Sequence, residues 1–228
     1  MSVISDKELG EITVRRNSNT RTMKATVAPN GQLRITLPSY VPLFMAKRMI
    51  TSSRTQLREL LQSRPSLVIT DGMQLGKSHS LHIRSGDQHS LRRSGNQLIL
   101  TLQDDEDSTD QHVVEEVRKE FLAILRREAK HHLPRRLQYL AETHGFTYSS
   151  LRFTHASSRW GSCNNKKAIS LNIGLMKLPF ELIDYVLIHE LSHTKHLNHS
   201  TKFWDEVAQA DPDYKQHRKL LKLHSPGV

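Results

Sequence analysis

The 228-residue sequence has one cysteine, Cys163, and no long run of apolar residues. A single cysteine excludes an intrachain disulfide. The first ten residues are polar, and no apolar stretch approaches the length that a membrane-spanning helix needs. We therefore expect a soluble, cytoplasmic protein without a membrane partner.

Acidic residues are fewer than basic ones, 23 against 33, which gives a formal net charge of +10. This charge favours attraction to polyanions such as nucleic acid, nucleotides or acidic proteins. The basic residues are scattered, however, and the sequence lacks a dense Lys/Arg block with interleaved aromatic residues. A solvated basic surface explains the charge as well as a nucleic-acid site does.

The sequence also lacks an intact nucleotide-binding loop. Residues 72–78, Gly-Met-Gln-Leu-Gly-Lys-Ser, resemble one, but three residues separate the glycines where a phosphate-binding loop needs four. No buried strand leads into the segment, and no strong helix follows it. We interpret it as a connection between strands.

Residues 1–103 are predicted to form a β-rich amino-terminal region. Apolar residues alternate with polar ones in three runs, at 12–14, 23–27 and 33–37. This alternation is typical of a meander of strands. A helix is expected over residues 42–63, and short strands separated by turn signals are expected at 66–70, 80–84, 88–92 and 97–102.

The acidic, polar run at 103–110 is the clearest break in composition, and we place the boundary of a second domain, 104–228, there. Residues 111–132 have the apolar spacing of a long amphipathic helix. Pro134 is predicted to start another helix, which ends near Gly145. Two short strands are expected next, at 151–154 and 168–172.

The pentapeptide His-Glu-Leu-Ser-His occupies residues 189–193, within a segment predicted to be helical from Pro179 onward. Two histidines four residues apart lie on one face of a helix, about 6 Å apart along its axis. His189 and His193 can therefore both bind one ion. Zinc is the ion that this pattern most often holds.

His199 follows Asn198, a residue that tolerates the left-handed conformation in which helices often end. The chain can turn back there and present His199 as a third ligand. Three protein ligands leave an open position, which is typical of catalytic zinc. Glu190 could then deprotonate a water molecule whose pKa the ion lowers to about 7. The alternative is a chance match, because the chain has 14 histidines; the helical context and the third histidine argue against it.

Five nearby residues have two interpretations each. Arg159 could stabilise an oxyanion or a phosphate, or form a structural ion pair. Asn172 could hold a substrate backbone or cap a turn. Cys163 could approach the metal as an inhibitory ligand or be a small buried thiol. Trp160 and Trp204 are interpreted as packing residues rather than as substrate platforms.

An ordered series of motifs resembles the YgjP-like metallopeptidase-domain family, within the zincin-like metallohydrolases. The series is Arg159-Trp160-Gly161-Ser162-Cys163, Ile169-Ser170-Leu171-Asn172, Pro179, Asp184-Tyr185-Val186, His189-Glu190-Leu191-Ser192-His193, Asn198-His199-Ser200, Phe203-Trp204 and Pro212. The resemblance implies an α+β fold, in which a zincin-like catalytic half with an H-E-x-x-H active-site helix follows a β-rich amino-terminal half. It also implies His189, His193 and His199 as ligands of one Zn²⁺ ion, with Glu190 as the general base.

More distantly, the chain resembles SprT-like proteases, which act on proteins attached to DNA. Metzincins share the spacing of the third histidine, but they carry a glycine where this chain has His196, which argues against a metzincin turn. Some relatives of the YgjP-like family are linked to nucleoside triphosphate hydrolysis, so the resemblance does not fix the substrate.

Three functions follow from these patterns. The first is a zinc-dependent metallopeptidase with a protein or peptide substrate. The second is a nucleoside triphosphate pyrophosphatase, or another phosphoanhydride hydrolase, that uses the same metal site on a nucleotide; the lack of a carboxylate cluster for a second metal weighs against it. The third is a DNA-associated SprT-like protease or a non-enzymatic nucleic-acid binder. The oligomeric state and the native metal do not follow from the sequence.

Overall fold

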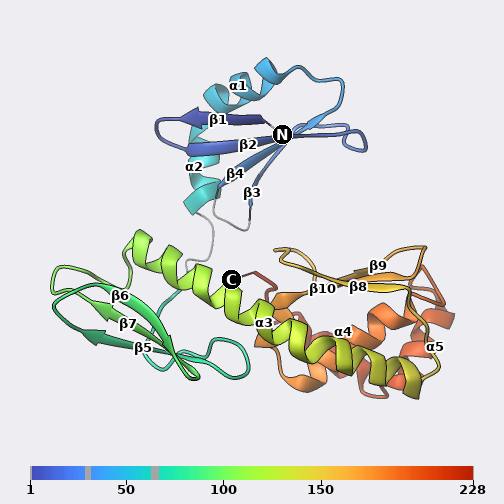
Figure 1. The fold of residues 1–228 in the computed structure, drawn as a ribbon. Coiled ribbons are helices and arrows are strands. Elements are labelled where there is room, and N and C mark those ends of the chain that lie inside the picture. The colour runs from blue at the N-terminus through green and yellow to red at the C-terminus, as the bar shows by residue number, and fades with distance from the viewer. Residues whose placement is uncertain (1, 29–31, 63–66, 228) are drawn as a thin grey trace. The chain divides into compact units, whose positions relative to one another are not determined.

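The structure is a computed structural model that describes residues 2–28, 32–62 and 67–227. Within these ranges the chain forms a mixed α/β fold with three sheets and six α-helices (Figure 1). Its contacts divide it into two units, Met1–Ser66 and Leu67–Val228, each with its own hydrophobic core. No helix in the described ranges is long and apolar enough to cross a membrane.

The first unit contains a four-stranded sheet of order β1-β2-β4-β3. Its strands are β1 (Ser2–Asp6), β2 (Gly10–Asn17), β3 (Lys24–Val27) and β4 (Leu33–Pro38). The alternating apolar residues face the core, and Ile12, Leu33 and Ile35 are fully buried. The predicted meander is wrong, because β2 and β4 pair in parallel. It also omitted β1, whose mostly exposed residues show no apolar alternation.

Two helices, α1 (Leu43–Ser52) and α2 (Arg54–Gln62), replace the one helix expected over 42–63; residue 63 lies outside the described ranges. The interruption falls at Ser53, where the N–H group of Ser53 and the hydroxyl of Ser52 both donate to the carbonyl oxygen of Met49. Serine side chains compete in this way with regular helical hydrogen bonds.

The second unit begins with a three-stranded sheet of order β5-β7-β6. Its strands are β5 (Ser80–Ser85), β6 (Ser90–Ser94) and β7 (Gln97–Leu102). Of the strand expected at 66–70, residues 67–70 form none, and residue 66 lies outside the described ranges. Leu81, Leu98 and Leu100 share one core with the helix that follows. The predicted boundary at 103/104 therefore falls inside this unit, between β7 and that helix.

Helix α3 (Gln111–Thr143) is 33 residues long and runs through Pro134, where two helices were expected. A proline inside a helix costs about 3 kcal/mol, because it removes a hydrogen bond and crowds the preceding turn. The apolar stripe continues past it, however, and Leu133 and Leu137 are buried. Burying each such side chain contributes about 1.5–3 kcal/mol, which offsets the cost of the proline.

Besides helix α4 (Phe180–Ser192), six elements follow α3 (Figure 1). They are β8 (Ser150–Thr154), β9 (Gly161–Cys163), β10 (Ala168–Asn172), the 3₁₀ helix η1 (Ile173–Lys177), α5 (Thr201–Ala210) and α6 (Tyr214–Leu221). The three strands form a sheet of order β8-β10-β9. Helices α3, α5 and α6 and strand β9 all contact α4. The buried α4 is therefore the element on which this part of the unit is assembled.

Candidate metal centre

Helix α4 contains two of the predicted site residues, His189 and Glu190. Pro179 precedes the helix and Glu181 lies in its first turn, where a negative charge complements the helix dipole. A spacing of four residues places Tyr185 and His189 on the same face. The helix ends at His193, whose N–H group bonds to the carbonyl oxygen of His189 over 3.3 Å.

His199 lies on the loop that leads into α5, and its ring lies close to the rings of His189 and His193. The ring centroids are 4.9 Å apart for His189 and His193, 5.1 Å for His189 and His199, and 4.8 Å for His193 and His199. The Nε2 atoms of His189 and His199 are 3.1 Å apart. One nitrogen from each ring lies within 4.8 Å of the others, so the three rings converge on one point.

These nitrogens fit a metal ion. Ligands bound about 2.1 Å from a tetrahedral ion lie roughly 3.4 Å apart, and the nitrogens of His189 and His199 are already 3.1 Å apart. Nδ1 of His193 lies 3.0 Å from the carbonyl oxygen of His196. Donation to this oxygen fixes the proton on Nδ1 and leaves the Nε2 lone pair for an ion.

The protonation of the rings also suits metal binding. Burial, assisted by the neighbouring histidines, lowers the pKa of His189 to about 3. Burial likewise lowers the pKa of His193. Both rings are therefore neutral at neutral pH, which is the state that binds a metal ion.

Helix α5 supplies an aromatic floor for the three histidine rings. The fully buried ring of Phe203 lies between 4.5 Å and 5.0 Å from each of them. The indole of Trp204 stacks on His199 at 5.7 Å and on Tyr214 at 5.4 Å. Trp204 is a packing residue, as interpreted from the sequence, but the side chain on which it packs is a candidate ligand. Its position five residues after His199, one helical turn into α5, is the sequence signal for this contact.

Glu190 follows the first of these histidines and is only 5% exposed. Its Oε2 atom has no hydrogen-bond partner among the described residues. Burial raises the pKa of its carboxyl to about 8, against the opposing effect of the positive charge of Arg159. The backbone of Gly161, on β9, lies against this carboxyl group. Sequence reasoning missed this role of Gly161, because the contact depends on how β9 packs on α4.

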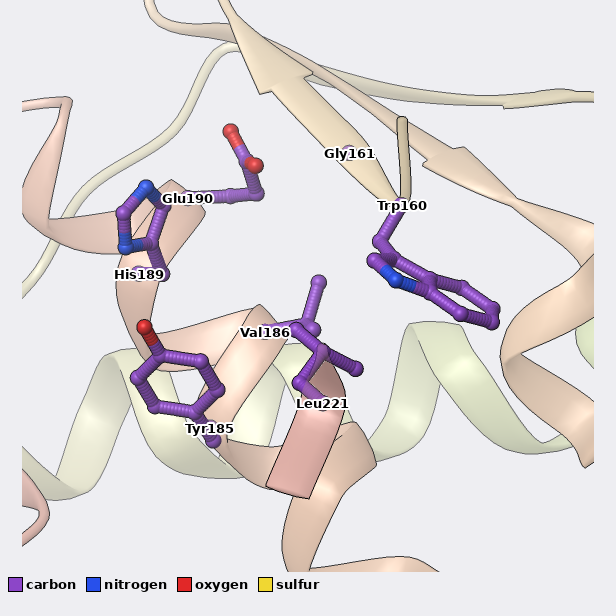
Figure 2. Close-up of a pocket in the computed structure, with 7 residues that line it drawn as sticks. All are labelled: Trp160, Gly161, Tyr185, Val186, His189, Glu190 and Leu221. Atoms are coloured by element: carbon purple, nitrogen blue, oxygen red, sulfur yellow. The ribbon is translucent and has the colours of Figure 1, made fainter. Parts of the chain in front are cut away.

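A pocket of about 170 Å³ opens beside Glu190 (Figure 2). Its lining residues are Trp160, Gly161, Tyr185, Val186, His189, Glu190 and Leu221. Figure 2 shows Glu190, His189 and Tyr185 on one side of the pocket and the indole of Trp160 across from them. Burial raises the pKa of Tyr185 to about 12, so its hydroxyl stays protonated and able to donate a hydrogen bond.

Arg159 and Asn172 occupy different surroundings. Arg159 is exposed and forms no ion pair with any described residue. Asn172 is fully buried, and its amide group donates to the carbonyl oxygens of Ala156 and Arg159 over 2.6 Å and 2.9 Å. Its side-chain oxygen accepts from the N–H group of Gly174 over 2.9 Å, which caps η1. Asn172 therefore holds the loop before β9 in place through its hydrogen bonds to the backbone of that loop.

Cys163 lies on β9 and is half-buried. Burial raises the pKa of its thiol, and the negative charge of Glu190 adds to this effect. The histidine cluster described above includes no cysteine. These surroundings favour the interpretation of Cys163 as a small, partly buried thiol.

Two comparisons with known proteins found a match. The family model described as YgjP-like, metallopeptidase domain, matches residues 21–224. A crystal structure of the metallopeptidase zymogen of Pyrococcus abyssi abylysin matches with 25% sequence identity and a TM-score of 0.36, covering 39% of this chain and 91% of that chain. No curated protein matches the chain. None of these findings supports a nucleotide or nucleic-acid partner.

Proposed function

The chain belongs to the YgjP-like family of metallopeptidase domains, and from this premise we propose that it is a zinc-dependent peptidase. Its substrate is a protein or peptide. One zinc ion is held by His189, His193 and His199, and Glu190 is the general base. The fold around the site is zincin-like, and residues 104–228 contain all four of these side chains.

The proposal is carried by the convergence of three ring nitrogens beside a buried carboxylate that has an unpartnered oxygen. Imidazole nitrogen is a preferred ligand of zinc, and three protein ligands leave a fourth position open. When bound, the ion supplies a Lewis acid that polarises a carbonyl group and lowers the pKa of water. His189 and His193 are neutral, and Phe203 packs against all three rings, so little rearrangement precedes binding of this ion.

Glu190 moves the proton. It lines the pocket, and its Oε2 atom has no partner among the described residues. Burial raises the pKa of its carboxyl to about 8, and the positive charge of a bound divalent ion would lower that pKa, so the ionised carboxylate can accept a proton from the attacking water. The same oxygen then returns the proton to the leaving nitrogen of the cleaved bond. The backbone of Gly161 lies against the carboxyl group and limits where it can move.

Arg159 and Tyr185 stabilise negative charge on the reacting carbonyl oxygen. The guanidinium of Arg159 is exposed, and its charge already acts on Glu190. The hydroxyl of Tyr185 lies on the His189 side of the pocket and stays protonated (Figure 2). Preorganised donors of this kind act where charge develops in the transition state. Asn172 contributes as a positioning residue, because it holds the backbone carbonyl of Arg159.

The pocket supports a peptide rather than a nucleotide substrate. Apart from Arg159 beside it, the proposed site includes no lysine or arginine for the several negative charges of a triphosphate, and none of the seven described residues that line the pocket is either. Trp160, Val186 and Leu221 give it an apolar wall. Such a wall suits an uncharged side chain of a peptide.

The test uses the zinc-loaded chain with an unfolded protein and, separately, with nucleoside triphosphates. We expect cleavage of peptide bonds and no release of phosphate. Glu190→Gln should retain zinc and lose turnover by a factor of roughly 10²–10⁴. Phosphate release without peptide cleavage would contradict the proposal, as would full peptidase activity in zinc-loaded Glu190→Gln. Cleavage that depends on added DNA would instead indicate a SprT-like role.

A further inference from the structure

A second cluster of metal-binding side chains lies where α3 begins beside the small sheet. His89 immediately precedes β6, Glu106 lies between β7 and α3, and His112 lies in the first turn of α3. One ligand atom from each of these residues lies within 4.8 Å of the others. We propose that His89, Glu106 and His112 form a second site, which binds a divalent transition-metal ion.

The carboxylate of Glu106 lies between the two imidazoles. Its Oε2 atom is 2.8 Å from Nδ1 of His89, and its Oε1 atom is 3.1 Å from Nε2 of His112. Neighbouring ligands of a tetrahedral ion lie roughly 3.4 Å apart, so small side-chain movements would enclose an ion. The N–H group of Gln103 donates to Oε2 of Glu106 over 3.1 Å, which holds the carboxylate at this position.

Glu116 provides an independent reason for a metal site. Its Oε2 atom lies 2.8 Å from Nε2 of His89, on the side of the ring away from Glu106. Histidines that bind metals commonly donate their second ring N–H to a carboxylate, which fixes the tautomer and orients the ring. With its proton on Nε2, His89 directs the Nδ1 lone pair toward Glu106 and His112.

The donor set defines the class of ion. Two imidazoles and one carboxylate suit zinc, nickel, copper or cobalt rather than calcium or magnesium. His112 is exposed, so the remaining coordination positions are open to water. Because the ligands come from three segments, the ion would fasten the start of α3 to the sheet of β5, β6 and β7. The site shares no residue with the candidate metal centre.

The alternative is an ion-pair network without metal, in which a protonated His89 bridges Glu106 and Glu116. The metal site and the ion-pair network are distinguished in a His193→Ala/His199→Ala variant, which is the background for the further substitutions. These two substitutions remove two ligands of the candidate metal centre, so any zinc that remains bound must be held elsewhere. Zinc binding is measured by calorimetric titration, and bound zinc by elemental assay after gel filtration. We expect this background to retain one zinc ion per chain.

Adding His112→Ala to the background should abolish this binding. The matched control is His131→Ala, another exposed histidine on α3, which should leave one ion bound. Equal zinc binding in these two variants would overturn the proposal. Circular dichroism confirms that each variant is folded, and Glu106→Gln repeats the test at a second ligand.

Glu116→Gln provides a graded readout. It should weaken zinc binding by roughly 10–100-fold without changing the stoichiometry, because it orients a ligand rather than binding the ion. Cobalt added to the background should give visible absorption bands that His112→Ala removes. If the background retains no zinc and zinc does not raise its melting temperature, the cluster is an ion-pair network and the proposal fails.

Discussion

The carboxyl group of Glu190 occupies the space where a side chain at position 161 would begin. A Cβ atom added to Gly161 would lie 2.6 Å from Oε1, 2.7 Å from Cγ and 2.8 Å from Cδ of Glu190. These distances are well inside van der Waals contact, and the carboxyl group is buried. Strand β9 can therefore approach the proposed general base this closely only with glycine at this position.

Gly161→Ala should displace the carboxyl group of Glu190 while leaving the three histidines in place. A misplacement of about 1 Å costs roughly a hundredfold in turnover, so we expect kcat to fall by about that factor and zinc affinity to stay unchanged. Peptide-cleavage kinetics and a zinc titration measure the two quantities. In the Glu190→Gln variant, adding Gly161→Ala should cause little further loss of kcat. A full additional loss in that background would show that Gly161 acts on something other than Glu190.

His199→Ala should abolish stable zinc binding, because it removes one of three proposed ligands. The matched control is His196→Ala, which lies three residues earlier on the same loop. His196 contributes its backbone carbonyl to Nδ1 of His193, and alanine retains that carbonyl. We therefore expect zinc content and peptidase activity near the unaltered level in His196→Ala. Equal zinc loss in the two variants, measured by elemental assay, would mean that His199 has no specific role as a ligand.

The sequence signal for the histidine site is local, and the structure brings the three predicted rings together. His189 and His193 share one helix face through their spacing, and the motif series identifies His199 and Glu190. The contributions of Gly161 and Phe203 depend instead on how β9 and α5 pack against α4. That packing joins segments far apart in the chain, and one sequence without structure does not specify it.

The same distinction explains the errors in the fold. Strand β1 has mostly exposed residues, so it lacks the alternation that identified its neighbours. Pro134 is a strong local stop signal, yet α3 continues because Leu133 and Leu137 are buried on either side of it. The composition break at 103–110 marks a connection within the second unit, since β7 and α3 share one core. In each of these cases the packing of segments in three dimensions, rather than the local sequence pattern, determines the structure.

Asn172→Ala should destabilise the second unit. The side chain satisfies the carbonyl oxygens of Ala156 and Arg159 and the N–H group of Gly174. Each buried polar group left without a partner costs about 1–3 kcal/mol, so we expect a loss of at least about 2 kcal/mol in the free energy of unfolding. Urea unfolding measures it. An unchanged unfolding midpoint with a raised KM would instead identify Asn172 as a direct substrate contact.

Residues 76–78 end the 72–78 segment that resembles a phosphate-binding loop, and they contact a carboxylate of the chain itself. Glu128, on α3, is 5% exposed and accepts from the N–H groups of Lys77 and Ser78 over 2.8 Å and 2.9 Å. The hydroxyl of Ser78 donates to the same carboxylate over 2.6 Å. Gly76 has a φ of +91°, and a Cβ atom there would collide with this carboxylate. The amide groups that would bind a phosphate are thus already occupied.

Glu128→Ala should therefore be strongly destabilising, because it leaves three donors in this partly buried loop without a partner. At about 1–3 kcal/mol for each donor, we expect a loss of at least about 3 kcal/mol in the free energy of unfolding. The matched control is Glu120→Ala on the same helix, which breaks a more exposed ion pair with Arg93. Such pairs contribute about 0–1 kcal/mol. Similar unfolding midpoints in urea for the two variants would show that solvent replaces the bonds of Glu128, and that the loop does not depend on α3.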